Sequence, residues 1–133
     1  MNLRRYIGIP YVTGGNSFEG CDCYTLCRLF NINELGNNLP DLSTLYKEAS
    51  CLNEENKIFK SWGEKLKTNW QEVTEPAIGD VVLFNFYNTP VHCAVYIGKN
   101  LCIHASEGST SHTEPLFGTD WERRMQGIIR WKS

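Results

Sequence analysis

The 133-residue sequence lacks several features that would assign a protein to a class at once. No apolar run approaches the roughly 18 residues of a membrane span, so no spanning segment is predicted. Thirteen basic and fifteen acidic residues give a net charge of -2, which does not indicate a nucleic-acid-binding protein. Repeats, low-complexity tracts and Gly/Ser/Pro linkers are absent, and we therefore predict a single domain over residues 1–133.

A secretory leader is also missing from the sequence as given. The start, MNLRRYIGIPYV, carries two arginines but no apolar stretch of signal-peptide length. We therefore expect synthesis in the cytoplasm, where a reducing environment keeps cysteines as thiols. Cys21 and Cys23 are too close in sequence to bridge each other without strain. A disulfide framework of the six cysteines remains the lesser alternative.

The first half of the sequence reads as helical. Asn2 can cap a short turn that Pro10 stops, and a turn-rich loop, TGGNSFEG, follows. Asp22 is a good N-cap for the segment CYTLCRLFNINEL, which Gly36 would end. A second, more polar helix is predicted to begin at Asp41 or Ser43.

The second half reads as short strands joined by tight turns, which is typical of an antiparallel meander. The last strand, GIIRW, is predicted to close or edge the sheet. The predicted strands are 69–73, 79–86, 91–98, 101–106 and 127–131. Helices followed by strands predict the α+β class, with the helices packed on the sheet.

Cys23 is the candidate nucleophile. As the first residue of a helix capped by Asp22, it lies where unpaired N–H groups and the positive end of the helix dipole stabilise a thiolate. The same N–H groups are candidates to bind an oxyanion. Cys27 lies one turn further along the helix, beside apolar residues, and is interpreted as buried filling. The hypothesis requires solvent to reach the Cys23 thiol.

A thiol needs a base, and the sequence has only three histidines. His92 and His104 lie on neighbouring predicted strands, where antiparallel pairing can set them side by side. We interpret His92 as the base and His104 as the group that orients its ring. His112 lies in a polar loop and is expected to face solvent.

Two structural interpretations compete with this one. A cysteine at a helix start and a histidine in a sheet are each more often structural than catalytic. A zinc site could use the same cysteines and histidines, but Cys21 and Cys23 are separated by one residue and do not match the usual C-x₂₋₄-C spacing. We therefore predict no metal site and no cofactor.

The sequence resembles one known family. The string PYVTGGNSFEGCDCYTLCR, at 10–28, is similar to the signature of NlpC-type cell-wall peptidases, written PY-x-x-GG-x-S-x-x-G-x-DC-S-G-L. The segments GDVVLFNF, PVHCAVYIG and CIHAS follow in the family order, so the resemblance covers about residues 6–106. It implies a papain-like fold and a cysteine endopeptidase that cuts peptidoglycan stem peptides, most often between D-glutamate and the following diamino acid.

The same resemblance implies roles for individual residues. Cys23, His92 and His104 would be nucleophile, base and orienting residue. Tyr11, in the PY element, would belong to the active site, and Asp22 would help to bind the free amine of the stem peptide. Tyr24 and Thr25 replace the usual Ser-Gly, as in tail-associated members from bacteriophages, so delivery to the wall by a phage tail is expected. A same-fold amidase or acyltransferase, and an inactive structural tail protein, are the alternatives.

Overall fold

The structure is a computed structural model in which residues 2–40, 70–86 and 89–132 are described, with only the backbone at 85, 86 and 89–91. The second helix predicted from Asp41 or Ser43 therefore lies outside the described residues. Within the described ranges, no helix is long and apolar enough to cross a membrane.

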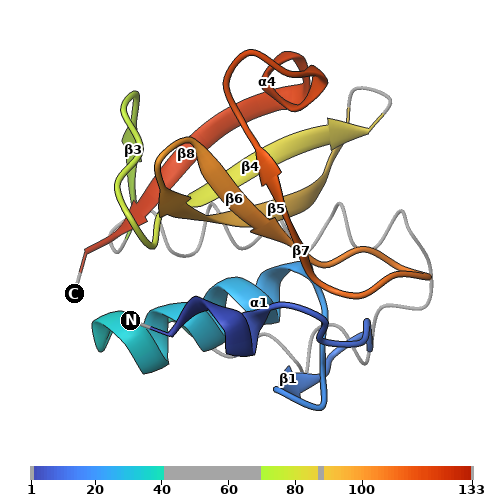
Figure 1. Ribbon diagram of the computed structural model, residues 1–133. Helices are drawn as coiled ribbons and strands as arrows, with labels where there is room; N and C mark the ends of the chain where they lie inside the picture. Colours follow the sequence, from blue (N-terminus) through green and yellow to red (C-terminus); the bar gives the residue numbers. More distant parts are fainter. Residues whose placement is uncertain (1, 41–69, 87–88, 133) are drawn as a thin grey trace.

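A six-stranded antiparallel sheet forms the centre of the fold (Figure 1). Its order is β3-β8-β4-β5-β6-β7, so β4, β5 and β6 form the predicted meander and β7 extends it. The strand bounds are β3 Trp70–Val73, β4 Val81–Phe86, β5 Thr89–Gly98, β6 Leu101–His104, β7 His112–Pro115 and β8 Met125–Trp131. A small hairpin, β1 Asn16–Ser17 with β2 Gly20–Cys21, precedes the main helix.

The prediction for the last strand is wrong in one respect. β8 neither closes nor edges the sheet, because it pairs with β3 on one side and with β4 on the other. Strand β7 and the short helix α4, Asp120–Arg124, were not predicted. The pairing of β8 has no local signal in the sequence, since its paired residues are 55–61 positions from those of β3 and 41–48 positions from those of β4.

The caps and the stop predicted for the N-terminal helices are present in the structure. Asn2 caps η1, Leu3–Tyr6, by accepting a hydrogen bond of 3.2 Å from the Arg4 N–H. Helix α1, Cys23–Phe30, continues into one π turn, η2 Asn31–Leu35, and Gly36 ends it with φ 68°. A positive φ is accessible to glycine at little cost, which explains the stop.

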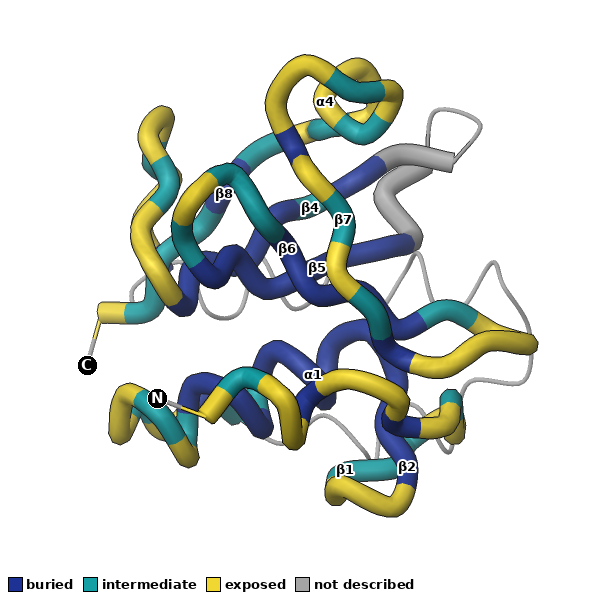
Figure 2. The backbone as a smooth tube through the Cα atoms, viewed as in Figure 1, coloured by how far each residue is buried: buried dark blue, intermediate teal, exposed yellow. Residues whose placement is uncertain are grey.

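The sheet separates two apolar clusters. Inward residues of α1 pack against β5 on one face, and Figure 2 shows both elements as buried. On β5, Cys93, Val95 and Ile97 belong to this first cluster, whereas Ala94 and Tyr96 belong to the cluster on the other face. This alternation is expected, because successive side chains of a β-strand point to opposite faces of the sheet. Helices packed on an antiparallel sheet confirm the α+β class.

Candidate active site

Asp22 fixes the start of α1. Its Oδ1 accepts the Thr25 N–H at 2.9 Å, and the Thr25 hydroxyl accepts the Asp22 N–H at 2.7 Å, so the two residues form a capping box. The second carboxylate oxygen accepts the Gly14 N–H at 2.9 Å and ties the preceding loop to the helix. The predicted N-cap is therefore confirmed, and Cys23 is the first helical residue.

The cap limits what the helix start can offer a substrate. The backbone N–H groups of Tyr24 and Thr25 both bond to the Asp22 carboxylate, and the Leu26 N–H bonds to the Asp22 carbonyl. These three N–H groups are therefore engaged rather than open to an oxyanion. Burial is the largest influence on the Asp22 carboxyl and raises its pKa, although the N–H bonds act in the opposite direction.

Cys23 lies in a cluster of three thiols. It is hydrogen-bonded to the side chain of Cys93, and the Cys27 and Cys93 sulfur atoms are 3.9 Å apart. Burial raises the pKa of Cys27 and of Cys93, so these two thiols are protonated and unreactive near neutral pH. The interpretation of Cys27 as buried filling agrees with its full burial.

Access to Cys23 differs from the expectation. The residue is only 2% exposed, whereas the hypothesis requires solvent to reach its thiol. A role as nucleophile would therefore require neighbouring atoms to move. The contact with Cys93 nevertheless brings Cys23 beside β5, and His92 is the residue that precedes Cys93 in that strand.

The two sheet histidines meet as predicted. His92 Nε2 and His104 Nδ1 are 2.9 Å apart, and the two rings lie within 5° of parallel. A hydrogen bond between these two nitrogens requires that one carries a proton and donates it, while the other is unprotonated and accepts. If His92 carries its proton on Nε2, its Nδ1 keeps an unshared electron pair.

Aromatic side chains enclose the histidine pair. Trp121, on α4, packs with its ring centroid 4.5 Å from that of His104, and Phe84 on β4 lies 5.4 Å from the same ring. Burial lowers the pKa of His92 to about 4 and that of His104 to about 3, since an apolar surrounding disfavours the imidazolium ion. Both rings are thus neutral at pH 7. Sequence reasoning missed Trp121 because helix α4 was not predicted, and it missed Phe84 because the register that sets Phe84 opposite His92 was not predicted.

The placement of His112 corrects the sequence interpretation. It begins β7 directly opposite His104 instead of lying in a loop, and the two ring centroids are 6.1 Å apart. Its side chain is 41% exposed and its Nε2 lies 3.2 Å from the Glu114 carboxylate. His112 therefore forms the outer neighbour of the histidine pair, and it contributes to the lowered pKa of both inner rings.

Tyr11 lies beside the segment that leads into α1. It is half-buried against the cluster that contains Cys23, and its backbone bridges to Cys21 at the end of β2. The structure thus gathers Tyr11, Asp22 and Cys23 around the start of α1. The proposed contacts of Tyr11 and Asp22 with a substrate remain predictions from the resemblance.

The thiols and imidazoles do not form an evident metal centre. Among the residues that the structure describes, no three His, Cys, Asp or Glu side chains converge on a point that could hold an ion. The five described cysteines, Cys21, Cys23, Cys27, Cys93 and Cys102, are free thiols.

Known proteins similar to this chain were identified by sequence and by structure. Gamma-DL-glutamyl hydrolase of Bacillus subtilis (strain 168) is 32% identical over 130 residues, which cover 96% of this chain. The same alignment covers only 27% of that protein, so the chain spans about a quarter of the length of this relative.

Solved structures share the fold at low sequence identity. The NlpC/P60 domain of the peptidoglycan hydrolase SagA aligns with a TM-score of 0.60 at 19% identity, over 96% of this chain and 92% of that one. A protein of Staphylococcus aureus similar to a lipoprotein aligns at 0.62 and 24% identity, over 98% of this chain and 39% of that one. The sequence profile of the NlpC/P60 family matches residues 8–130. The chain therefore belongs to the NlpC/P60 family, with the papain-like α+β fold that the sequence predicted.

Proposed function

We propose that this protein is a cysteine endopeptidase that hydrolyses amide bonds in the stem peptides of peptidoglycan. Membership of the NlpC/P60 family supports the broader class, a peptidoglycan hydrolase with a cysteine nucleophile. The observation that carries the finer proposal is the 2.9 Å contact between His92 Nε2 and His104 Nδ1. His92 directly precedes Cys93, whose thiol is hydrogen-bonded to Cys23 at the capped start of α1. Cys23 is the proposed nucleophile, His92 the base and His104 the orienting residue.

The proposed first step takes His92 as the donor in the histidine contact. His92 Nε2–H donates a hydrogen bond to His104 Nδ1, and this bond would hold the His92 ring in one tautomer and one orientation. The Nδ1 of His92 then accepts the Cys23 proton as sulfur attacks the carbonyl carbon. A pKa of about 4 keeps His92 unprotonated at pH 7, which is the state that a general base requires.

The remaining steps follow from the same pair. The protonated His92 returns its proton to the leaving amine as the C–N bond breaks, which leaves an acyl group on the Cys23 sulfur. Water then attacks the thioester, His92 takes one of its protons, and the acid product departs with the thiol restored. A carboxylate third member would hold the imidazolium more strongly, so the neutral His104 is expected to orient the base more than to stabilise its charge.

We further propose that the bond cleaved joins D-glutamate to the following diamino acid. The relative named gamma-DL-glutamyl hydrolase supports a glutamyl bond as the target. Tyr11 and Asp22 are the residues that the family resemblance assigns to substrate binding. Delivery to the cell wall by a phage tail stays a proposal from the Tyr24-Thr25 replacement alone.

Digestion of defined muropeptides followed by mass spectrometry tests the proposal. The wild-type protein should release fragments cut after D-glutamate, and Cys23→Ala should release none above background. Cys27→Ala is the matched control, because it removes a thiol from the next turn of the same helix and should keep most of the activity. Equal turnover by Cys23→Ala and the wild type would refute the assignment, and fragments cut at another bond would indicate an amidase or acyltransferase.

The 2% exposure of Cys23 favours one alternative, a structural protein of the same fold with an inactive site. Mild treatment with iodoacetamide near pH 7 distinguishes the two. An enzyme whose site opens should be labelled at Cys23 first, ahead of the fully buried Cys27 and Cys93. Labelling of Cys23 no faster than of these two thiols would favour the inactive protein.

A further inference from the structure

Three thiols meet between α1 and β5, and the proposed hydrolysis uses only one of them. Cys23 is hydrogen-bonded to the side chain of Cys93, and the sulfur atoms of Cys27 and Cys93 are 3.9 Å apart. Cys93 is therefore the member of the cluster that contacts both others. A disulfide bond between two of these thiols would be a modification outside the hydrolytic reaction.

The pair within the helix does not fit a disulfide bond. Cys23 and Cys27 are one helical turn apart, a spacing that separates Cβ atoms by about 5–6 Å. A disulfide bond needs Cβ atoms about 3.5–4.5 Å apart, so this pair cannot close while α1 stays helical. The Cys27 thiol also donates to the Cys23 carbonyl at 3.3 Å, and oxidation of Cys27 would break this bond.

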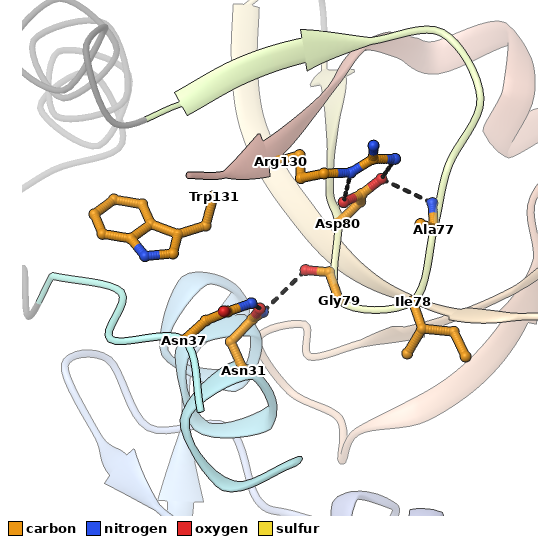
Figure 3. A pocket seen from close by; sticks show the side chains of 8 residues that line it. All are labelled: Asn31, Asn37, Ala77, Ile78, Gly79, Asp80, Arg130 and Trp131. Atoms are coloured by element: carbon orange, nitrogen blue, oxygen red, sulfur yellow. Dashed lines mark hydrogen bonds and ion pairs between the residues drawn. The ribbon is translucent and has the colours of Figure 1, made fainter. Parts of the chain in front are cut away.

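Both pairs that cross the interface use Cys93, which β5 holds against α1. The helix is tied at both ends, by the Asp22 cap at its start and by Asn31 at its end, which donates to the Gly79 carbonyl at 2.9 Å (Figure 3). These bonds fix the position of α1 beside the sheet. An oxidised sulfur on α1 would therefore lie in contact with the Cys93 thiol without a rearrangement of the fold.

Access distinguishes Cys23 from Cys27. Cys23 is 2% exposed, whereas Cys27 and Cys93 are fully buried. Cys23 is also the first residue of α1, where the helix dipole favours the thiolate, which is the form that peroxides oxidise. Hydrogen peroxide is a small neutral molecule, so it requires a smaller movement of the neighbouring atoms than a peptide substrate does. Oxidation should therefore begin at Cys23.

We propose that Cys23 and Cys93 form a reversible disulfide bond in the presence of a hydroperoxide, and that this modification switches the hydrolase off. The switch rests on the proposed function, because it removes the proposed nucleophile, whereas formation of the bond does not depend on hydrolysis. Hydrogen peroxide transfers one oxygen atom to the Cys23 sulfur, which gives a sulfenic acid and water. The Cys93 sulfur then attacks the Cys23 sulfur, and the S–O bond breaks. The departing hydroxide takes the Cys93 proton and leaves as a second water.

Burial explains why Cys93 acts only as the second thiol. It raises the pKa of Cys93, so this thiol is protonated and does not itself react with peroxide near neutral pH. Contact with the sulfenic sulfur gives Cys93 a high effective concentration, which offsets its low nucleophilicity. The bond would also protect Cys23, since a sulfenic acid without a partner thiol is oxidised further to the irreversible sulfinic acid.

Peptide mapping after peroxide treatment tests the bond itself. The wild-type protein is treated with hydrogen peroxide, quenched with catalase, denatured, alkylated and digested with trypsin. Cleavage after lysine and arginine places Cys23 in peptide 6–28 and Cys93 in peptide 68–99, so the bond should join these two peptides. Fragment ions then locate it, because peptide 6–28 contains two other cysteines. Absence of the link, or a link from Cys93 to another cysteine, would overturn the proposal.

Single substitutions test the role of Cys93. After prolonged peroxide treatment, dithiothreitol should restore hydrolysis in the wild type but not in Cys93→Ala, whose Cys23 passes on to the sulfinic acid. Dimedone present during the treatment should label Cys23 more strongly in Cys93→Ala than in the wild type. Cys27→Ala is the matched control, because it removes the other buried thiol of the cluster and should recover as the wild type does.

Cys93→Val, whose side chain suits a strand, takes the place of Cys93→Ala should that variant fold poorly. Recovery of either Cys93 variant to the wild-type level would contradict the proposal. Failure of the switch can be distinguished from failure of the proposed hydrolysis. A bond between Cys23 and Cys93 in a protein without hydrolytic activity would refute only the endopeptidase. Hydrolysis that peroxide abolishes without forming the linked peptides would refute only the disulfide.

Discussion

The two ends of α1 make a useful comparison, because each is held by one buried polar side chain. At the first end Asp22, 1% exposed, receives backbone N–H groups. At the far end Asn31, also 1% exposed, donates to two backbone carbonyls. Both satisfy helix groups that would otherwise lose their partners on burial.

The ends differ in what the sheet brings beside them. β5 places the Cys93 thiol against Cys23, and His92, the preceding residue of that strand, pairs with His104, so the elements that carry the proposed nucleophile and base adjoin each other. The far end meets the turn before β4 and the end of β8, which supply amides, an indole and a neutralised ion pair. Each end of α1 is thus fixed by a buried polar side chain, and the neighbouring strands and turns decide which chemical groups lie beside it.

Among the substitutions near Cys23, removal of the proposed base His92 should lower kcat most. His92→Ala is expected to lower kcat on muropeptides by about 10³-fold, because general-base catalysis contributes about 10²–10⁴. His104→Ala should cost less, about 10–100-fold, since this residue orients the base without taking the proton. His112→Ala is the control at a half-exposed histidine and should cost less than 10-fold. A greater loss for His104→Ala than for His92→Ala would reverse the roles.

Acid should weaken the fold through the histidine pair. The unfolded chain takes up a proton at the ordinary histidine pKa of 6.5, whereas the folded protein does so only near 4 at His92 and near 3 at His104. The unfolded state therefore binds more protons between pH 6.5 and 4, and the free energy of unfolding falls as the pH falls through this window. For His92 alone the loss is about 3 kcal/mol.

Urea unfolding at pH 7, 5.5 and 4.5 measures this dependence. The double variant His92→Gln/His104→Gln keeps polar side chains of similar size but cannot titrate there, so its stability should decline less over the same range. Parallel curves for the two proteins would show that the histidines do not cause the decline.

Substitution of Asn31, at the far end of α1, should lower the stability of the protein without changing its rate of hydrolysis. Asn31→Ala leaves the Cys27 and Gly79 carbonyls without their donor, and we expect a loss of about 2–3 kcal/mol in the free energy of unfolding. The hydrolysis rate per folded molecule should be unchanged at 25 °C. Asn33→Ala is the matched control, because it removes one bond of 2.8 Å to the Leu29 carbonyl at an exposed position. Asn31→Ala should destabilise the protein more than Asn33→Ala, and a similar urea midpoint would contradict this.

The smallest expected effect concerns the cap itself. Asp22→Asn keeps one oxygen acceptor but turns an amide donor toward a backbone N–H, at a cost of about 1 kcal/mol. Because the carboxylate is buried and engaged, KM for stem peptides with a free amine should change less than threefold. A rise above 10-fold would show instead that Asp22 binds the amine, as the family resemblance predicts.

Much of the site could be predicted from short-range rules. A cap residue acts on the N–H group three positions ahead, so Asp22 and the start of α1 could be read from the sequence. Alternation in neighbouring strands was enough to pair His92 with His104. The thiol–thiol contact of Cys93 with Cys23 was not predictable in this way, because the two residues are 70 positions apart in the chain.

The sequence by itself determined where η1 and α1 begin and which residues face the same way along a strand. These properties depend on hydrogen bonds and side-chain directions within a few residues of the chain. Only the tertiary structure decided that β8 runs inside the sheet, that Trp121 and Phe84 keep His92 and His104 neutral, and that Asn31 donates to the Gly79 carbonyl. Desolvation and strand order depend on groups that are distant in sequence, and the chain brings these together only when it folds.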